Sequence, residues 1–490
     1  MRQMKPIDGT DRGSDVALPT LIILAGSGAA LLTTLAARII MARALTPAEL
    51  GLILLGVALV SGVGGAASLG LAAAAGRRAA DLRAKGRTAE AHISGRSALV
   101  IGAASGGAAA AALLVAAAAL AFLPAAGRFG GVLGILAPVA LGLAPGFAMV
   151  GVARGFGDYV GRPLIRDGGG GLLRLAAIGV AVMMQGGLRW IAFGFMIGSV
   201  AGEFGFIAYG VLRGWVRRQG EHAWDRDLWQ GLRPYAVMEL LSQLTQWVDM
   251  LILGVLGAPA VVGYYGVARS FSRALEIVHI SAGHNFLPAA TAALHHGGRD
   301  EFVRVYVRTR TFIFALLWPF LALCLAAPAT VIRPLFGEVY LPATPVLRLL
   351  GVALAVQAVF GYKDLALIAL GRASLTAGVS VRSFGAGLLA MVLLIPPFGA
   401  TGAAAGVLVM AVVRGAALAH LLWREAAIRP WIEDLPRAVL WAVTLTGGAW
   451  VLTLLAGATG VVAAAWVAGA ALVGSFFVLI SLFPVRRWAA

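Results

Sequence analysis

Charged residues are scarce in this chain: they make up 12% of its 490 residues, whereas a soluble domain carries about 25%. Acidic residues are the scarcer kind, with 22 Asp+Glu against 39 Lys+Arg and a formal net charge of +17. In a soluble protein this excess would suggest nucleic-acid binding. Because 60% of the chain is hydrophobic, the composition favours a membrane protein and argues against a soluble enzyme.

Several chemical signatures are also missing from the sequence. The only cysteine, Cys324, excludes a disulfide or a cysteine-based metal site within a monomer. There is no GxxxxGK[ST] phosphate loop, no HExxH metal pattern and no Ser, His and Asp spacing typical of a hydrolase. The polar loops leave no room for a catalytic domain. We therefore expect a carrier or a scaffold, with no enzymatic activity, no cofactor and no bound metal.

Apolar runs fill most of the chain. A membrane-crossing helix needs about 20 mostly apolar residues, and fourteen stretches meet that length approximately. The sequence therefore predicts an all-α polytopic membrane protein. The stretches are 18–41, 48–75, 97–123, 130–153, 169–187, 189–212, 233–256, 260–287, 309–328, 344–370, 375–396, 399–423, 437–458 and 461–483.

The distribution of Lys and Arg gives an orientation, because cytoplasmic loops accumulate basic residues. With the N-terminus inside, the cytoplasmic segments hold 27 of the 39, the external loops hold four, and 39 minus 27 minus 4 leaves eight within the spans. This asymmetry predicts a multi-pass protein of the inner (cytoplasmic) membrane with both termini in the cytoplasm. It also explains the net charge without nucleic acid.

Glycines four residues apart recur within the predicted spans. Small residues at this spacing let two helix backbones approach closely in a membrane. The clearest run is Gly194, Gly198 and Gly202 on the sixth span, and shorter pairs are Gly102/Gly106 and Gly402/Gly406. We predict that these positions face neighbouring helices; codon bias alone is the alternative explanation.

Ionisable residues within spans are costly and mark candidate functional positions. Eight basic residues stand against five acidic ones, which leaves an excess of positive charge inside the membrane. The basic residues are Arg38, Arg174, Arg269, Arg273, Arg348, Lys363, Arg382 and Arg414, and the acidic ones are Glu203, Glu239, Asp249, Glu276 and Asp364.

Two consecutive spans carry matching polar stripes. On the seventh span the stripe covers roughly 120° of the helix; on the eighth it follows the same spacing. Asp249 and Arg269 both lie about 12–14 Å below the outer surface, so we predict that they pair, either as a gate that opens during transport or as a static packing pair. The stripes are Glu239, Ser242, Gln243, Gln246 and Asp249, and Tyr265, Arg269, Ser272, Arg273 and Glu276.

The remaining charges differ in depth. Arg174, Arg382, Arg414 and Glu203 lie toward the cytoplasmic side, where a long arginine can extend to the interface. Lys363 and Asp364 are adjacent on the tenth span, which suggests a local pair or a gate. Arg38 lies deeper, near the outer end of the first span.

The chain has a short internal repeat. TPAELG (Thr46–Gly51) follows the first span and APAVVG (Ala258–Gly263) follows the seventh, 212 residues later. Parallel repeats of six helices are a known transporter plan.

Longer segments resemble a known family, the polysaccharide and O-antigen flippases of the multidrug/oligosaccharidyl-lipid/polysaccharide (MOP) exporter superfamily. The similarity covers most of residues 18–423, and its segments occur in the family's order. They are ARALTPAELG (Ala42–Gly51), ASLGLAAA (Ala67–Ala74), WVDMLILGVLGAPAVVGYYGVAR (Trp247–Arg269), PLFGEVYLPATPVLRLLGVAL (Pro334–Leu354), ALGRASLTAG (Ala369–Gly378) and LLIPPFGATGAAAG (Leu393–Gly406).

The resemblance implies two six-helix lobes around a central cavity that opens alternately to each side. On this plan residues 1–17 form a cytoplasmic tail, 18–232 the N-lobe, 233–436 the C-lobe, and 437–490 two further helices and a short tail. The implied substrate is a polyprenyl-pyrophosphate-linked oligosaccharide, moved with H+ or Na+ coupling among membrane lipids. Glycosyltransferases or a polymerase of the same pathway are further expected partners.

The resemblance also suggests roles for the intramembrane charges. Basic residues would offset the pyrophosphate, with Arg38, Arg269 and Arg273 as first choices, and Asp249 stands at the acidic position of the family's seventh span. The cationic set is Arg38, Arg269, Arg273, Arg174, Lys363 and Arg382, and the ion-coupling or gating set is Asp249, Glu239, Gln243, Gln246, Glu276 and Asp364.

Three other functions remain open. A multidrug exporter of the same superfamily would expel cationic drugs, which the positive excess disfavours. A flippase for the lipid-linked peptidoglycan precursor would open on an arginine-rich segment, which residues 1–50 lack. A membrane scaffold that organises glycosyltransferases would not need stacked polar stripes.

Overall fold

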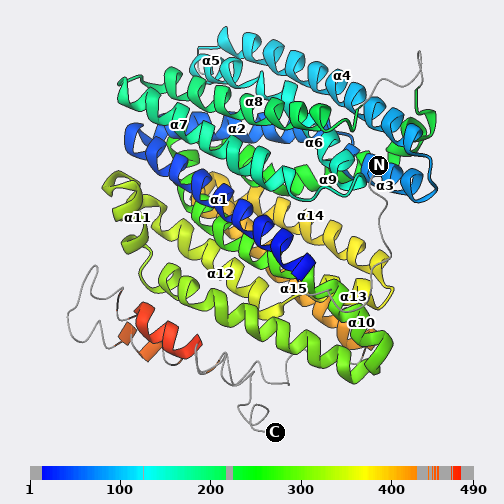
Figure 1. Ribbon diagram of the computed structural model, residues 1–490. Coiled ribbons are helices and arrows are strands. Elements are labelled where there is room, and N and C mark those ends of the chain that lie inside the picture. The colour runs from blue at the N-terminus through cyan, green and yellow to red at the C-terminus, as the bar shows by residue number, and fades with distance from the viewer. Residues whose placement is uncertain are drawn as a thin grey trace. The chain divides into compact units, whose positions relative to one another are not determined.

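The computed structural model describes residues 14–124, 126–216 and 224–426, with scattered positions between 440 and 475 (Figure 1). This part of the chain consists of helices and their connections, without β-strands. Seven of its helices are long and apolar enough to cross a membrane, or eight if one bent helix pair counts as a single span. The predicted all-α polytopic membrane fold is therefore confirmed.

Residue contacts divide the chain into two compact units, with the boundary between Trp247 and Val248 inside helix α9. The helices of unit 1 are α1 (Ser14–Ala44), α2 (Pro47–Ala66), α3 (Leu71–Ala84), α4 (Thr88–Ala121), α5 (Gly127–Leu136), α6 (Val139–Gly155), the π-helix η1 (Arg162–Gly169), α7 (Gly170–Met183), α8 (Leu188–Leu212) and the first part of α9 (Arg226–Leu256). Unit 2 continues with α10 (Pro259–Ala326), α11 (Ala329–Phe336), the 3-10 helix η2 (Glu338–Ala343), α12 (Thr344–Phe360), α13 (Lys363–Ala369), α14 (Ala373–Phe398) and α15 (Ala400–Ala426).

Each of the first twelve predicted spans falls on one helix or on two consecutive ones. Stretch 130–153 is the bent pair, α5 and α6, whose axes differ by 41°. Stretches 260–287 and 309–328 both lie in α10, which is kinked at Gly298, where φ is +67°. The last two predicted spans, 437–458 and 461–483, lie largely outside the described residues, so the total of fourteen stays a prediction.

The two copies of the short repeat both begin a helix. At the start of α2 the hydroxyl of Thr46 accepts a hydrogen bond from the amide of Glu49, and the carboxylate of Glu49 accepts one from the amide of Thr46. This reciprocal capping satisfies two amides that lack helical partners. Pro47 and Pro259 occupy the first helical turn of α2 and α10, where a missing amide proton costs nothing.

The glycine run on α8 faces the backbone of the adjacent helices α7 and η1. A Cβ at Gly198 would lie 2.2 Å from the Cα of Arg174, and one at Gly202 would lie 2.7 Å from the Cα of Gly170. At Gly194 the nearest atom would be the carbonyl oxygen of Ala177, at 2.8 Å. These contacts leave no space for a side chain, so the sequence prediction of close helix packing is confirmed here.

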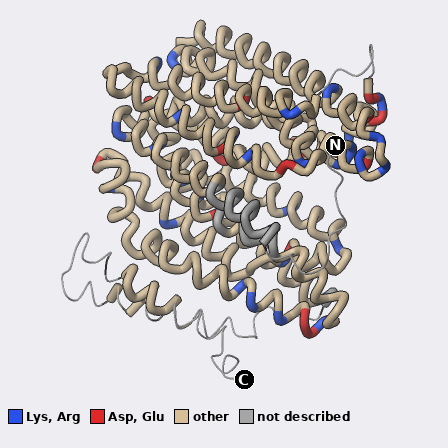
Figure 2. Tube along the Cα trace, viewed as in Figure 1, with Lys and Arg blue, Asp and Glu red and all other residues tan. Residues whose placement is uncertain are grey.

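One end of unit 1, around α3, is basic (Figure 2). There the guanidinium of Arg78 donates to Asp225, which precedes α9, and forms an ion pair with Asp227 at 2.6 Å. The Asp225 carboxylate also accepts from the amide of Leu228 and so caps α9. Beneath this network Leu228 packs into an apolar core with Phe206 of α8. The network fixes the start of α9 on unit 1.

Candidate functional site

The Asp249 carboxylate lies at the centre of a polar cluster in unit 2. Asp249 is buried near the end of α9, and its Oδ2 lies 3.1 Å from the Nε of Arg269 on α10. The hydroxyl of Tyr265 donates to the same oxygen at 2.6 Å, and the amide of Met250 donates to Oδ1 at 2.7 Å. The predicted Asp249–Arg269 pair is therefore present in the structure.

Arg269 also connects this pair to the next turns of α10. Its guanidinium donates to Glu276 at 3.3 Å, and Arg273 lies one turn beyond Arg269 on the same helix. Two carboxylates, of Asp249 and Glu276, thus offset two guanidinium groups. The cluster is balanced in charge, and the positive excess of the membrane region lies elsewhere.

The predicted stripe on α9 is split between the two units. Glu239, Gln243 and Gln246 lie on the unit 1 side of the boundary, and Asp249 lies on the unit 2 side. The amide of Gln243 donates to Glu239 at 2.7 Å and is buried against Gly65 of α2, where a Cβ would lie 2.4 Å from the Gln243 Cδ. Gln246 is half-buried. The structure brings together Glu239 and Gln243, but not the whole stripe.

The tenth predicted span is broken between α12 and α13, at Gly361 with φ of +63°. Lys363, the first residue of α13, is 1% exposed. Its ammonium lies 3.4 Å from the Gly415 carbonyl oxygen and 3.4 Å from the centre of the Phe360 ring. Within the part of the chain that the structure describes, no carboxylate pairs with Lys363.

Asp364, the neighbour of Lys363, is engaged with a different cation. It accepts from the Arg414 guanidinium of α15 at 3.0 Å. The sequence left open a local pair between Lys363 and Asp364 or a gate. The two do not pair with each other in the described structure, because the ammonium points at neutral groups and the carboxylate points at α15.

Unit 1 contains a buried ion pair that the sequence did not predict. The guanidinium of Arg166, in η1, donates to Glu203 of α8 through Nε at 2.7 Å and through a terminal nitrogen at 2.8 Å. In the sequence Arg166 falls between the predicted spans 130–153 and 169–187, and Glu203 falls toward the cytoplasmic side of the span 189–212. If the predicted span at 169–187 had been extended back to residue 162, Arg166 would have been placed on the same helix as Arg174.

The other predicted residues are distributed over both units. Arg174 of α7 donates to the Thr34 hydroxyl at 3.0 Å and lies over the Phe195 ring. Arg38 of α1 is half-buried in unit 1, and Arg382 of α14 is exposed in unit 2. Within unit 2 the structure therefore groups Asp249, Arg269 and Glu276, with Arg273 one turn further along α10.

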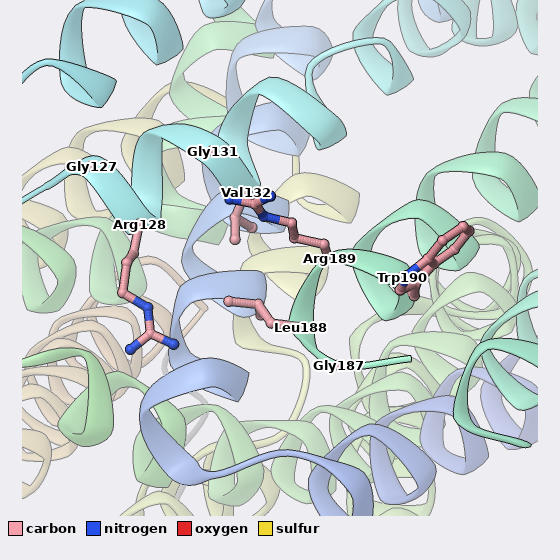
Figure 3. Close-up of a pocket in the computed structure, with 8 residues that line it drawn as sticks. All are labelled: Gly127, Arg128, Gly131, Val132, Gly187, Leu188, Arg189 and Trp190. Atoms are coloured by element: carbon pink, nitrogen blue, oxygen red, sulfur yellow. The ribbon is translucent and has the colours of Figure 1, made fainter. Parts of the chain in front are cut away.

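A pocket of about 430 Å³ opens between the first turns of α5 and α8 (Figure 3). Figure 3 shows Arg128 coming from α5 and Arg189 from α8, with Leu188 between them. In the sequence these two arginines are among the four basic residues of the predicted external loops. Among the described residues, no group of three or more His, Cys, Asp or Glu side chains is placed to hold a metal ion.

No protein-family model and no curated protein matches the chain. Solved structures do match. One is the lipid II flippase MurJ in an inward closed conformation, at 13% identity, with a TM-score of 0.69, over 97% of this chain and 100% of that one. Another is a multidrug resistance MATE family transporter of the MOP superfamily in an inward-facing conformation, at 16% identity, with a TM-score of 0.67, over 85% and 99%.

A third match is a MOP superfamily transporter from Pyrococcus furiosus, at 16% identity, with a TM-score of 0.52, over 85% of this chain and 94% of that one. Its description refers to a binding pocket of reversed polarity and to a different function. At these identities the similarity shows the fold alone. This chain has the fold of MOP superfamily transporters.

Proposed function

We propose that the protein is a flippase for a polyprenyl-pyrophosphate-linked oligosaccharide, a precursor of a polysaccharide. It moves this lipid from the cytoplasmic to the outer leaflet of the inner membrane by alternating access, coupled to a gradient of H+ or Na+. The polyprenyl tail stays in lipid, and the protein supplies a path for the charged and polar headgroup.

The observation that carries this proposal is the way the intramembrane charges are partnered. Four of the five predicted intramembrane carboxylates, on Glu203, Asp249, Glu276 and Asp364, bind an arginine. The fifth, Glu239, accepts from Gln243. An exporter of cationic drugs needs carboxylates available to its substrate, so their engagement disfavours that function.

Arg174 and Lys363 direct their hydrogen bonds and ring contacts to neutral groups. Arg174 in unit 1 binds a hydroxyl and an aromatic ring, and Lys363 in unit 2 binds a carbonyl and an aromatic ring. An isolated charge in a low-dielectric region is costly, and a pyrophosphate would supply the missing counter-charge. Each unit thus offers an anionic substrate a cation that is not directly bonded to a carboxylate.

The Asp249 cluster suggests a means of ion coupling. In the observed state Asp249 competes with any anionic substrate for Arg269. Protonation of Asp249 would remove its charge and leave Glu276 as the carboxylate bonded to Arg269, which frees the Nε side of the guanidinium for the pyrophosphate. Glu276, Glu239, Gln243, Gln246 and Asp364 are the other proposed coupling residues, and Arg38, Arg174, Lys363 and Arg382 are the other proposed headgroup contacts.

A flippase for the lipid-linked peptidoglycan precursor is the second candidate. The MurJ structure corresponds to 97% of this chain, against 85% for the MATE transporter. That function would use the same fold on another lipid-linked sugar. A cation-coupled multidrug exporter is the third candidate, and the engaged carboxylates weigh against it.

The test is transport in liposomes that contain the purified full-length protein. We expect flipping of a fluorescent polyprenyl-pyrophosphate sugar that responds to an imposed H+ or Na+ gradient and is lost in Arg269→Ala. Arg333→Ala is the matched control, because Arg333 is exposed and pairs with an exposed carboxylate, that of Glu338. Preference for the peptidoglycan precursor would select the second candidate. Efflux of a cationic dye without flipping would refute the proposal.

A further inference from the structure

The pocket between α5 and α8, in unit 1, has the properties of a ligand site. Its volume of about 430 Å³ falls in the range of about 300–1,000 Å³ typical of small-molecule sites. Each helix contributes one arginine, and glycines keep the space open. The lining residues are Gly127, Arg128, Gly131 and Val132 of α5, and Gly187, Leu188, Arg189 and Trp190 at the start of α8.

The lining of the pocket is positively charged. It contains two guanidinium groups and no carboxylate. Arg128 forms an ion pair at 3.4 Å with Glu49, which is not a lining residue. Arg189 forms no hydrogen bond or ion pair with the residues that the structure describes. Because a guanidinium presents a planar fork of donors that matches phosphate oxygens, a phosphate is the anion that this lining fits.

The surroundings of the pocket place it at the level of lipid headgroups. It lies where two membrane helices begin, at the end of unit 1 opposite to the basic end around α3 (Figure 1). Trp190 is 63% exposed at its edge, and tryptophan is enriched where a membrane meets water.

The pocket has room that is not filled by packing. A Cβ placed at Gly131 or at Gly187 meets no atom within 4 Å. The first turns of both helices also lack a side-chain cap, so their amides are available to an oxygen-rich ligand.

We propose that this pocket binds the phosphate group of a lipid headgroup, held between Arg128 and Arg189 while the acyl chains lie along the adjoining helices. The site is separate from the Asp249 cluster, and its occupation does not depend on the proposed transport. A binding measurement therefore tests it independently of any flipping assay.

The experiment measures binding of dioctanoyl-phosphatidylglycerol to the purified full-length protein in a neutral detergent. We expect Arg189→Gln to weaken binding at least about tenfold, because a charge-assisted hydrogen bond of this kind is worth a factor of ten or more. Gly131→Leu should weaken it similarly by filling the pocket without removing any charge. A similar loss of lipid affinity in Arg189→Gln and in Gly131→Leu would support the site.

Two control variants match these changes elsewhere. Gly107→Leu adds the same side chain on α4, at a position where a Cβ also meets no atom within 4 Å, and Arg333→Gln removes an exposed arginine from unit 2. Both should bind as the wild-type chain does. If Gly131→Leu does not fold, as judged by size-exclusion chromatography and circular dichroism, Arg189→Gln still decides the result, since it changes an exposed side chain.

Two further ligands identify the source of the phosphate. Inorganic phosphate should bind at least tenfold more weakly than the short-chain lipid, because it lacks the apolar chains. Equal binding of the two would show a site for free anions and overturn the lipid assignment. Unchanged lipid binding in Arg189→Gln and Gly131→Leu would overturn the site itself.

Discussion

Arg166 holds Glu203 with two parallel hydrogen bonds, of 2.7 and 2.8 Å, between the π-helix η1 and the middle of α8. Both side chains are about nine-tenths buried, and the guanidinium also lies over the Phe147 ring. Bidentate pairing of this kind fixes orientation as well as distance. The pair therefore sets how the irregular segment η1 sits on α8 within unit 1.

Glu203→Ala should destabilise the protein by about 3–5 kcal/mol, because it leaves the buried Arg166 charge without its counter-charge. The measurement is the thermal unfolding midpoint in detergent. Lys85→Gln is the control, since Lys85 forms an exposed pair with Asp81 on α3 and its loss should leave the midpoint unchanged. A Glu203→Ala protein as stable as the wild type would contradict this account.

Gly146→Ala should also destabilise unit 1, for a steric reason. A Cβ at Gly146 would lie 2.0 Å from the Oε2 of Glu203, so the new methyl group must displace the carboxylate from Arg166. We expect a loss of about 1–3 kcal/mol, typical of overpacking. Gly131→Ala, at a helical position with open space, should instead be neutral or slightly stabilising. Equal effects of the two substitutions would argue against the clash.

The sequence was sufficient to predict several features because they depend on helix periodicity alone. The glycines of α8 had the spacing that close helix contact requires, and they meet α7 and η1 as expected. The pairing of Asp249 with Arg269 followed from equal depths on two helices joined by a short turn. Both predictions needed only the rise and the period of a regular helix.

Other features depend on irregular backbone, which periodicity does not describe. The π-helix places Arg166 against Glu203, although the residues appeared to belong to a loop and to the interface. The break at Gly361 makes Lys363 the first residue of a new helix, with its ammonium against the Gly415 carbonyl oxygen. Gln243 lies on the predicted polar face of α9, but the absence of a side chain at Gly65, a residue of another helix, decides what it packs against.

Lys363→Met should stabilise the protein while impairing transport. The ammonium is buried against a carbonyl and a ring, without a carboxylate among the described residues, so an apolar side chain of similar length should gain about 1–3 kcal/mol. Lys85→Met is the control at an exposed lysine and should not raise the midpoint. A less stable Lys363→Met protein would show that the charge has a structural partner.

Acid should weaken the network around Asp225 at the basic end of unit 1. Burial raises the pKa of the Asp225 carboxyl, but hydrogen bonds from Arg78 and the Leu228 amide lower it by more, so the pKa lies below its usual value. The stabilisation is thus fully present above the usual pKa of about 3.9 and disappears as the pH falls through the lower folded-state value.

Asp225→Asn should accordingly cost about 1.5–3 kcal/mol at pH 7 and at pH 5, the range for hydrogen bonds to a charged group. The cost should shrink as the pH falls below about 3.9. Thermal midpoints of both proteins at pH 7, 5 and 3 provide the check. A difference that stays constant down to pH 3 would mean that the carboxylate charge has no part in the network.

A charge exchange at Asp249 and Arg269 tests whether their pairing belongs to the transport cycle. Asp249→Arg and Arg269→Asp each place two like charges about 3 Å apart in a buried cluster, so each should reduce flipping at least tenfold. The double variant restores an ion pair across the same gap, although Tyr265 then faces a guanidinium in place of its acceptor. We therefore expect partial recovery of flipping in liposomes.

Asp249→Asn separates pairing from coupling at the same position. It keeps the shape of the side chain and an acceptor for Tyr265, but removes the charge that competes with a pyrophosphate for Arg269 and the proton that the gradient would supply. Flipping should then persist down a substrate gradient and lose its response to an H+ gradient. If transport by Asp249→Asn were the same as that of the wild type under both conditions, the pair would serve only to pack α9 against α10.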